Sequence, residues 1–212
     1  MKLFEYDKNH NCSIIGTDEA GRGSGIGAVF AGAVYFPPEN KNLSKKLTLL
    51  NDSKQLSKKR GEELYEIIKS ETINCVTPIS AEEIEEINIL NASLKAMRIS
   101  VETVAKQVNR SDILVLVDGN KLIPNIAIKQ KYVVKGDGIS ASIAAASILA
   151  KVERDRYVEQ LAQEFPQYAW DKNMGYLTKE HLDAIDKYGT SPFHRKSFLQ
   201  KHFAKQEQLS LF

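Results

Sequence analysis

The feature that most restricts the fold is an uninterrupted apolar run of strand length, ILVLV at 113–117, which ends abruptly at Asp118-Gly119. A run that is apolar at every position, rather than at alternate positions, is typical of a strand buried on both faces. Such strands lie in sheets that helices cover on both sides. We therefore predict a central strand here, with Asp118 at its carboxyl end.

The remaining segments alternate between strand and helix patterns. Two apolar stretches, 13–18 and 28–36, are separated by a glycine-rich turn, and this spacing predicts an antiparallel hairpin. Further strands are predicted at 73–79 and 132–134, and helices at 57–69, from 80, at 91–108, 140–165 and 178–188, and from 197. A hairpin followed by alternating elements predicts an α/β fold with a mixed sheet flanked by helices.

The distribution of charge is more informative than the net charge of +2. Segment 41–60 carries six lysines and one arginine against one acid, segment 62–86 carries eight glutamates against one lysine, and segment 187–206 carries five basic residues and no acid. Such segregation can form a phosphate-facing surface on a nearly neutral protein. Taken alone, these segments are better explained as solvated helix and loop faces.

Two isolated cysteines and the absence of long apolar runs bear on the location of the protein. Cys12 and Cys75 lack a metal-ligand spacing and fit free thiols in a reducing compartment. The first ten residues contain no apolar signal core, and no apolar run is long enough to span a bilayer. We expect a cytoplasmic protein with no membrane partner, and nothing in the sequence demands more than a monomer.

Four acids follow or end predicted strands and form the main chemical signal. They are Asp18, Glu19, Asp118 and Asp137. Carboxylates gathered at one place repel one another, and a hard divalent cation such as Mg²⁺ or Mn²⁺ converts that repulsion into binding. Each acid alone is better explained as a turn former or helix cap. Four acids at strand ends together favour a cation site.

No other catalytic constellation competes with these acids. The four histidines, at 10, 181, 194 and 202, form no ligand pattern, and we expect His181 on a helix surface. The serines have no recognisable partner for nucleophilic catalysis. The glycine-rich segment DEAGRGSGIG lacks the Lys-Ser/Thr pair that closes a P-loop.

Six blocks of sequence resemble those of the ribonuclease HII family, in the same order. They are GTDEAGRGSGIG (16–27), NDSKQLS (51–57), NILNASLKAM (88–97), LVDGN (116–120), KGD with SIAAASILAKVERDR (within 135–156) and GYLTKEHLDAIDKYGTSPFHRKSF (175–198). The resemblance implies a ribonuclease H-like fold and endonucleolytic hydrolysis of RNA in RNA–DNA hybrids. It also implies cleavage 5′ of a single ribonucleotide embedded in duplex DNA, by a two-metal reaction that leaves 5′-phosphate and 3′-hydroxyl ends.

The resemblance also assigns roles to individual residues. Asp18, Glu19, Asp118 and Asp137 become the catalytic, metal-binding carboxylates. The loop Gly21-Arg22-Gly23 becomes the reader of the ribonucleotide, Tyr176 the ring that stacks on the next deoxyribose, and Lys54 a backbone contact. Outside the family context Tyr176 is better explained as a half-buried aromatic at a helix start, and Lys54 is equally well explained as a solvated lysine. The chain departs from the usual pattern at Ala28, Gly138, Ile139, Glu153 and Asn173-Met174.

We predict a catalytic domain at 1–190, a helical extension at 191–205 and a mobile tail at 206–212. The tail ends in Gln208, Leu209, Ser210, Leu211 and Phe212, which resembles the pentapeptide by which bacterial proteins bind the replication sliding clamp. A clamp groove would accept Gln208 and bury Leu209, Leu211 and Phe212. Packing on the protein's own surface, or simple fraying, is the alternative.

Three rival interpretations remain at this stage. Ribonuclease HIII usually carries an extra N-terminal domain and lacks the Gly-Arg-Gly loop, whereas here the first motif begins within the first twenty residues. Another nuclease of the same fold, such as a resolvase or integrase, would not be separated by fold alone. A hybrid-binding module without catalysis is disfavoured by the complete set of acids.

Overall fold

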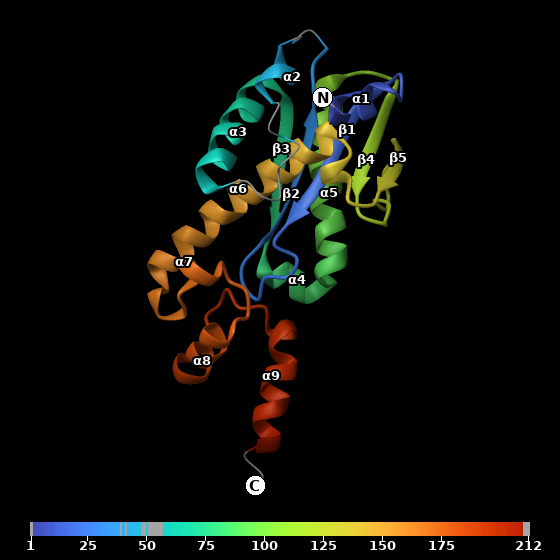
Figure 1. The fold of residues 1–212 in the computed structure, drawn as a ribbon. Coiled ribbons are helices and arrows are strands. Elements are labelled where there is room, and N and C mark those ends of the chain that lie inside the picture. The colour runs from blue at the N-terminus through green and yellow to red at the C-terminus, as the bar shows by residue number, and fades with distance from the viewer. Residues whose placement is uncertain (1, 39, 41, 48–49, 51–56, 210–212) are drawn as a thin grey trace.

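The computed structural model describes residues 2–38, 40, 42–47, 50 and 57–209 (Figure 1). Its centre is a five-stranded sheet in the order β3-β2-β1-β4-β5. The strands are β1 (Ser13–Ala20), β2 (Val29–Tyr35), β3 (Ile73–Ile79), β4 (Ile113–Asp118) and β5 (Lys129–Val133). Strands β1, β2 and β3 pair antiparallel, while β4 pairs parallel with both β1 and β5. The predicted mixed sheet and opening hairpin are confirmed.

The strand that we predicted as central lies one place from the centre. β1 occupies the middle of the sheet, and β4 lies between β1 and β5. Val115, Leu116 and Val117 are nevertheless fully buried, as the uninterrupted apolar run predicts. A run of this kind identifies a strand that is covered on both faces, but it does not show which of two inner strands lies at the middle of the sheet.

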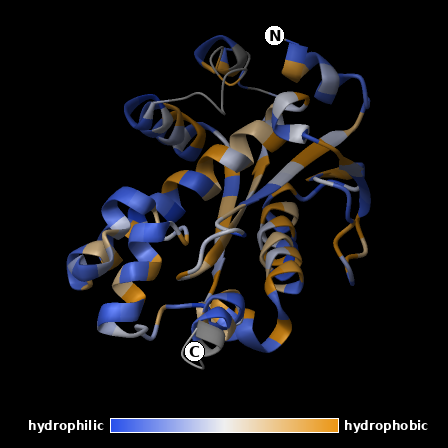
Figure 2. Cartoon of the chain, turned by 60° about the horizontal axis from the view of Figure 1, so that its bottom comes forward, coloured by the Kyte–Doolittle hydropathy of each residue, from blue (hydrophilic) through white to orange (hydrophobic). Residues whose placement is uncertain are grey.

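Helices cover both faces of the sheet (Figure 1). Helix α5 (Ile89–Val108), preceded by α4 (Ala81–Ile87), packs on one face, where Met97, Val101 and Val104 bury against Ile15 and Val115. Helix α6 (Ala141–Glu164) packs on the other face, together with α1 (Lys2–Lys8), α2 (Leu43–Lys46) and α3 (Lys58–Glu71). Figure 2 shows the same layering as mostly hydrophobic strands beneath more hydrophilic outer helices.

Two glycines allow α6 to lie directly on the sheet. A Cβ on Gly16 would lie 2.2 Å from the carbonyl carbon of Ser142, and a Cβ on Gly32 would lie 2.5 Å from the carbonyl oxygen of Ala146. Both distances are shorter than any real contact, so only glycine fits. This close approach places the end of β1, and therefore Asp18, beside the middle of α6.

The predicted helix starts are confirmed by their capping hydrogen bonds. The hydroxyl oxygens of Ser57, Ser80, Ser140 and Thr178 each accept a hydrogen bond from the N–H three residues later. Helix α1 and the short α7 (Trp170–Asn173) carry no comparable signal and were not predicted. Glu153, one of the departures from the family pattern, accepts a hydrogen bond from the Tyr65 hydroxyl at 2.6 Å and so joins α6 to α3.

The C-terminal part forms a second core cluster at the end of α6. Here α7, α8 (Lys179–Tyr188) and the start of α9 (Lys196–Leu209) pack with the turn η3 (Pro166–Tyr168) around Trp170. Leu199 and Arg195 are fully buried, so the beginning of the predicted extension packs into the body of the protein. Helix α9 then projects away from the sheet (Figure 1) and continues to Leu209, three residues beyond the predicted start of the tail at 206.

The segregated charges largely pair with one another in the structure. Lys46 pairs with Glu71, Lys58 with Glu159 and Arg60 with Glu63, so part of the basic segment neutralises nearby acids. Cys12 and Cys75 are free thiols. Within the described ranges, the structure contains no helix whose length and apolar character would suit a membrane crossing.

Candidate functional site

Two adjacent parallel strands bring Asp18 and Asp118 to the same edge of the sheet. Thr17 on β1 is paired with Val117 on β4, and the next residue on each strand is the acid. Asp137 reaches this edge from the turn η2 (Gly136–Gly138), which follows β5. The Gly136 N–H donates a hydrogen bond to Asp118 Oδ1 at 2.6 Å and thereby holds this turn against the end of β4.

The acids affect one another electrostatically, which places them in one cluster. Burial, followed by the charges of Asp118 and Glu19, raises the pKa of Asp18 well above its usual range. Burial and the charge of Asp137 raise the pKa of Asp118, against the effect of the backbone N–H groups that it accepts. Burial raises the pKa of Glu19, and the Arg22 guanidinium opposes that rise. Sequence reasoning expected the four acids at one place; the structure puts them at one end of the sheet, within range of one another's charges, and their role as a metal site stays a prediction.

The donor set fits a hard divalent cation, but the side chains are engaged with protein donors. Asp18 Oδ1 accepts from the Glu19 N–H at 2.7 Å, and Glu19 Oε1 accepts from Arg22 Nη1 at 3.0 Å. Over the part of the chain that the structure describes, no three His, Cys, Asp or Glu side chains are arranged to hold a metal ion. Coordination therefore requires the carboxylates to exchange these hydrogen bonds for a cation, which mutual repulsion among buried acids favours.

The Gly21-Arg22-Gly23 loop lies directly beside the acids. Gly21 has a φ of +93°, a backbone conformation that side-chain-bearing residues rarely adopt. Arg22 is half exposed, and its contact with Glu19 joins the loop to the carboxylate cluster. The predicted glycine-flanked arginine and the predicted acids thus form one continuous surface.

A buried arginine that sequence reasoning missed holds this loop in place. Arg195 Nη1 donates to the carbonyl oxygens of Gly21 and Ser24, both at 2.8 Å, and Arg195 Nε donates to that of Gly27 at 2.9 Å. Burial, and then the charge of Arg154, lower the pKa of Arg195 to about 10, so it remains charged at neutral pH. In the sequence Arg195 stands in a basic segment and in the block 175–198, and neither pattern indicates that it is buried.

A second buried arginine connects the loop to Tyr176. Arg154 Nη2 donates to Ser24 Oγ at 3.1 Å and to the Met174 carbonyl, and its guanidinium carbon lies 5.6 Å from the Tyr176 ring centre. A Cβ placed on Gly23 would lie 3.6 Å from Tyr176 Cε1, so the ring stands next to the loop. About half of Tyr176 is exposed, which leaves the ring open to a ligand.

The expectation that His181 lies on a helix surface is wrong. His181 and His194 are both buried, and their Nε2 atoms lie 3.1 Å apart among Tyr168 and Trp170. His181 is four residues before the buried Ile185 and therefore shares its inward helix face. That spacing was the available signal, but a histidine in a mostly polar helix does not by itself indicate burial.

The buried histidine pair makes stability depend on pH. Burial and then the His181 neighbour lower the pKa of His194 to about 4, from an ordinary value of 6.5. The unfolded chain therefore binds more protons between these values, so stability is full above pH 6.5 and falls toward pH 4. The loss from this group amounts to about 3 kcal/mol, since one pKa unit is about 1.4 kcal/mol.

His194→Gln is the matched variant for this pH dependence, because glutamine keeps an N–H donor near Nε2 and does not titrate. We expect urea unfolding at pH 7 and pH 4 to show a smaller stability loss in His194→Gln than in the wild type, by about 2–3 kcal/mol. Equal losses in the two proteins would contradict the assignment.

Some predicted site residues fall outside the described part of the chain. Lys54, Leu211 and Phe212 lie there, and their proposed contacts stay predictions. Gln208 and Leu209 are the last two residues of α9. The predicted clamp motif therefore begins on a helix end.

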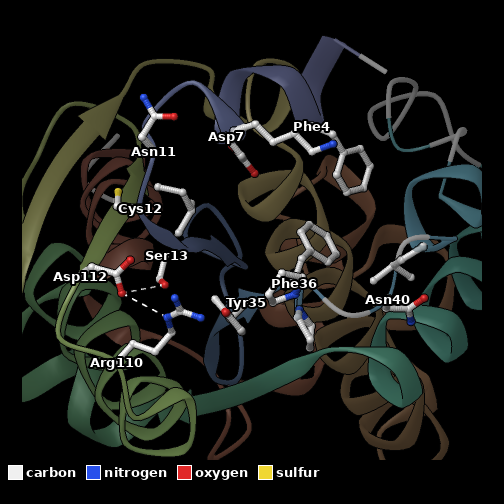
Figure 3. A pocket seen from close by; sticks show the side chains of 15 residues that line it. Phe4, Asp7, Asn11, Cys12, Ser13, Tyr35, Phe36, Asn40, Arg110 and Asp112 are labelled. Atoms are coloured by element: carbon white, nitrogen blue, oxygen red, sulfur yellow. Dashed lines mark hydrogen bonds and ion pairs between the residues drawn. The ribbon is translucent and has the colours of Figure 1, made fainter.

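A pocket of about 540 Å³ lies away from the acids, at the opposite end of β1 (Figure 3). It is lined by residues of α1, the start of β1 and the end of β2, among them Asp7, Phe36 and Ser13. Arg110 and Asp112 form an ion pair at its edge, and Asp112 accepts a hydrogen bond from Ser13 Oγ at 3.1 Å. None of the candidate site residues lines this pocket, so its size does not mark the carboxylate site.

Comparison with known proteins links this geometry to one family. Residues 15–205 match the family model described as ribonuclease HII. Ribonuclease HII of Rickettsia africae is 48% identical over 201 residues, covering 93% of this chain and 97% of the relative. The PCNA:RNase HII complex from Archaeoglobus fulgidus matches with a TM-score of 0.69 at 26% identity, over 86% of this chain and 91% of that chain. Bst-RNase HIII in complex with Mn²⁺ matches with a TM-score of 0.69 at 17% identity, over 89% of this chain and 66% of that chain, and this likeness shows the fold alone.

Proposed function

Since the chain belongs to the ribonuclease HII family and is therefore a ribonuclease H hydrolase, we propose that it cuts the RNA strand of RNA–DNA hybrids and cuts 5′ of single ribonucleotides in duplex DNA. The observation that carries this proposal is the contact between Arg22 and Glu19 at 3.0 Å. It joins the loop that would read the ribonucleotide to the carboxylates that would serve hydrolysis. A rival ribonuclease HIII is disfavoured because the matching family model is that of ribonuclease HII.

We assign binding of two divalent cations, Mg²⁺ or Mn²⁺, to Asp18, Glu19, Asp118 and Asp137. Bound cations of this kind activate water and stabilise the leaving oxygen of a phosphodiester. The chain itself supplies four buried or half-buried oxygen donors, whose mutual repulsion the cations relieve. The products would carry 5′-phosphate and 3′-hydroxyl ends.

The Gly21-Arg22-Gly23 loop would identify the ribonucleotide. Only the 2′-hydroxyl distinguishes RNA from DNA at a given position, and glycines let backbone groups approach it without obstruction by a Cβ. The guanidinium of Arg22 is half exposed and suits an adjacent phosphate. The Tyr176 ring, beside Gly23, would pack on the sugar of the following nucleotide, where an additional hydroxyl would clash.

The test is cleavage of a DNA duplex that contains one ribonucleotide, with Mg²⁺, with Mn²⁺ and with a chelator. We expect a single cut 5′ of the ribonucleotide in the presence of either cation, and no cut with the chelator or in an all-DNA duplex of the same sequence. A long RNA–DNA hybrid serves as the second substrate. Cleavage of the long hybrid without cleavage at the single ribonucleotide would reject the junction-reading part of the proposal.

We further propose that the C-terminal residues Gln208, Leu209, Leu211 and Phe212 bind a sliding clamp. The Archaeoglobus fulgidus relative is described in a complex with PCNA, which supports a partner of this kind. The extension of α9 away from the sheet would carry Gln208 and Leu209 clear of the nucleic-acid site (Figure 1).

Deleting residues 208–212 is expected to weaken clamp binding at least tenfold, because buried aromatic and leucine anchors dominate short-motif interfaces. Surface plasmon resonance against the clamp of the same organism measures this effect. The rate on a short hybrid, where no clamp is present, should be unchanged. Lys205→Ala, just before the motif, is the control and should bind the clamp like the wild type. Undiminished clamp binding by the deletion variant would remove the tail from the interface.

A further inference from the structure

The backbone of Tyr176 is attached to the buried histidine pair. The Tyr176 carbonyl oxygen lies 3.0 Å from His181 Nδ1 and also accepts a hydrogen bond from the Thr178 N–H at 2.8 Å. Its ring points out of the C-terminal core and is about half exposed. The position of this ring relative to the loop at Gly23 therefore depends on buried side chains that a bound nucleic acid would not contact.

The hydrogen bonds determine which nitrogen of each histidine carries a proton. Trp170 Nε1, which can only donate, points at His181 Nε2 at 2.9 Å, so that nitrogen is unprotonated. His181 Nδ1 therefore carries the proton and donates it to the Tyr176 carbonyl oxygen. His194 Nε2 lies 3.1 Å from the same nitrogen and donates to it by sharing its single lone pair with Trp170 Nε1.

The protonation of His194, at the other end of this series of hydrogen bonds, is determined in the same way. His194 Nδ1 accepts from the Ser191 N–H at 2.8 Å, so it is unprotonated and both histidines are neutral. A proton added to His181 would point its Nε2–H at the Trp170 N–H. A proton added to His194 would point its Nδ1–H at the Ser191 N–H. Burial accordingly lowers the pKa of both His181 and His194. The relay from Ser191 through His194 and His181 to Tyr176 thus has one consistent arrangement of donors and acceptors.

We propose that His181, held in one tautomer by Trp170 and His194, is a positioning residue that sets the place of the Tyr176 ring and thereby the preference for a deoxyribose after the ribonucleotide. This inference rests on the proposed role of Tyr176 in reading that sugar. Neither histidine touches substrate. Their effect passes through the Tyr176 carbonyl, while Arg154 holds the ring from its other side.

Two substitutions at one position separate positioning from simple core packing. Asparagine places its amide nitrogen near Nδ1 and can still donate to the Tyr176 carbonyl oxygen, whereas glutamine places it near Nε2 and cannot. Both substitutions remove the ring from its contacts with Tyr168 and Trp170, so both should lower thermal stability by similar amounts. Only His181→Gln should alter discrimination.

The measurement is kcat/KM on two duplexes, one with a single ribonucleotide and one with two consecutive ribonucleotides, so that the sugar after the first cleavage site differs by one hydroxyl. The readout is the ratio of the two values for a cut 5′ of the first ribonucleotide. We expect His181→Gln to change this ratio at least fivefold toward equality, and His181→Asn to stay within twofold of the wild type. Tyr176→Ala measures the full loss of discrimination.

The outcomes are distinguishable. If Tyr176→Ala leaves the ratio unchanged, its proposed role in reading the sugar fails, and the positioning role of His181 fails with it. If Tyr176→Ala alters the ratio but the Asn and Gln variants behave alike, positioning alone is refuted and the proposed function stands. Should His181→Gln not fold, His181→Leu replaces it, because leucine also removes the donor to the Tyr176 carbonyl oxygen and brings no polar group into the core. The ratio must then move toward equality, and a ratio like that of the wild type would overturn the proposal.

Discussion

Asp118→Asn is expected to reduce turnover by about a thousandfold or more while leaving the fold intact. Loss of one carboxylate from a divalent-cation site removes several kcal/mol of transition-state stabilisation, and each 1.4 kcal/mol is about tenfold in rate. Asparagine has nearly the same shape, and its side-chain oxygen can still accept the hydrogen bond that Gly136 donates to Asp118. The substitution therefore removes charge without opening a cavity.

The stability of this variant provides an internal check on the assignment. The pKa of Asp118 is raised by burial and by Asp137, so its charge is unfavourable when no cation is present. We expect the melting temperature of Asp118→Asn without metal to equal or exceed that of the wild type, and the increase on adding Mg²⁺ or Mn²⁺ to shrink. Asp171→Asn, at an exposed position on α7, is the control and should retain full turnover. Turnover of Asp118→Asn at the wild-type level would refute the carboxylate site.

Arg195→Ala is expected to lower the free energy of unfolding by about 3–5 kcal/mol, because it takes the donor from several buried carbonyl oxygens at once. The guanidinium donates to the carbonyl oxygens of Gly21, Ser24 and Gly27, and the Gly21 oxygen also accepts a long hydrogen bond from the Ser24 N–H at 3.3 Å. An unsatisfied buried carbonyl costs about 1–3 kcal/mol. The truncation also leaves a cavity at the base of the loop.

Arg195→Lys separates the charge from the geometry of this contact. Lysine keeps the positive charge but not the planar arrangement of donors that reaches three carbonyl groups, so we expect an intermediate loss of stability. Lys196→Ala, at the exposed neighbouring position, should change the free energy of unfolding by less than about 0.5 kcal/mol. Denaturant unfolding measures all three variants, and a loss below 1 kcal/mol for Arg195→Ala would show that the loop does not depend on this guanidinium.

Local patterns were sufficient for the elements and for the positions of the acids. The apolar run before Asp118 identified a strand covered on both faces, and side-chain hydroxyls at Ser57, Ser80 and Thr178 identified helix starts. Both signals act over a few residues, through burial of neighbouring side chains or through one capping hydrogen bond. The placement of Asp18 beside Asp118 followed from the expectation that both acids end strands of one sheet.

Only the tertiary structure decided which polar side chains are buried and what they hold. Arg195 contacts the loop at Gly21, 174 residues earlier in the chain, and Arg154 contacts Ser24, 130 residues earlier. In the sequence an arginine or histidine is expected at the surface, because burying it without partners is costly. Folding supplies those partners from distant segments, so His181, His194 and both arginines gain structural roles that no local pattern can express. The sequence by itself thus determined most strands, the capped helix starts and the positions of the acids, while the three-dimensional packing determined how the loop and Tyr176 are held beside them.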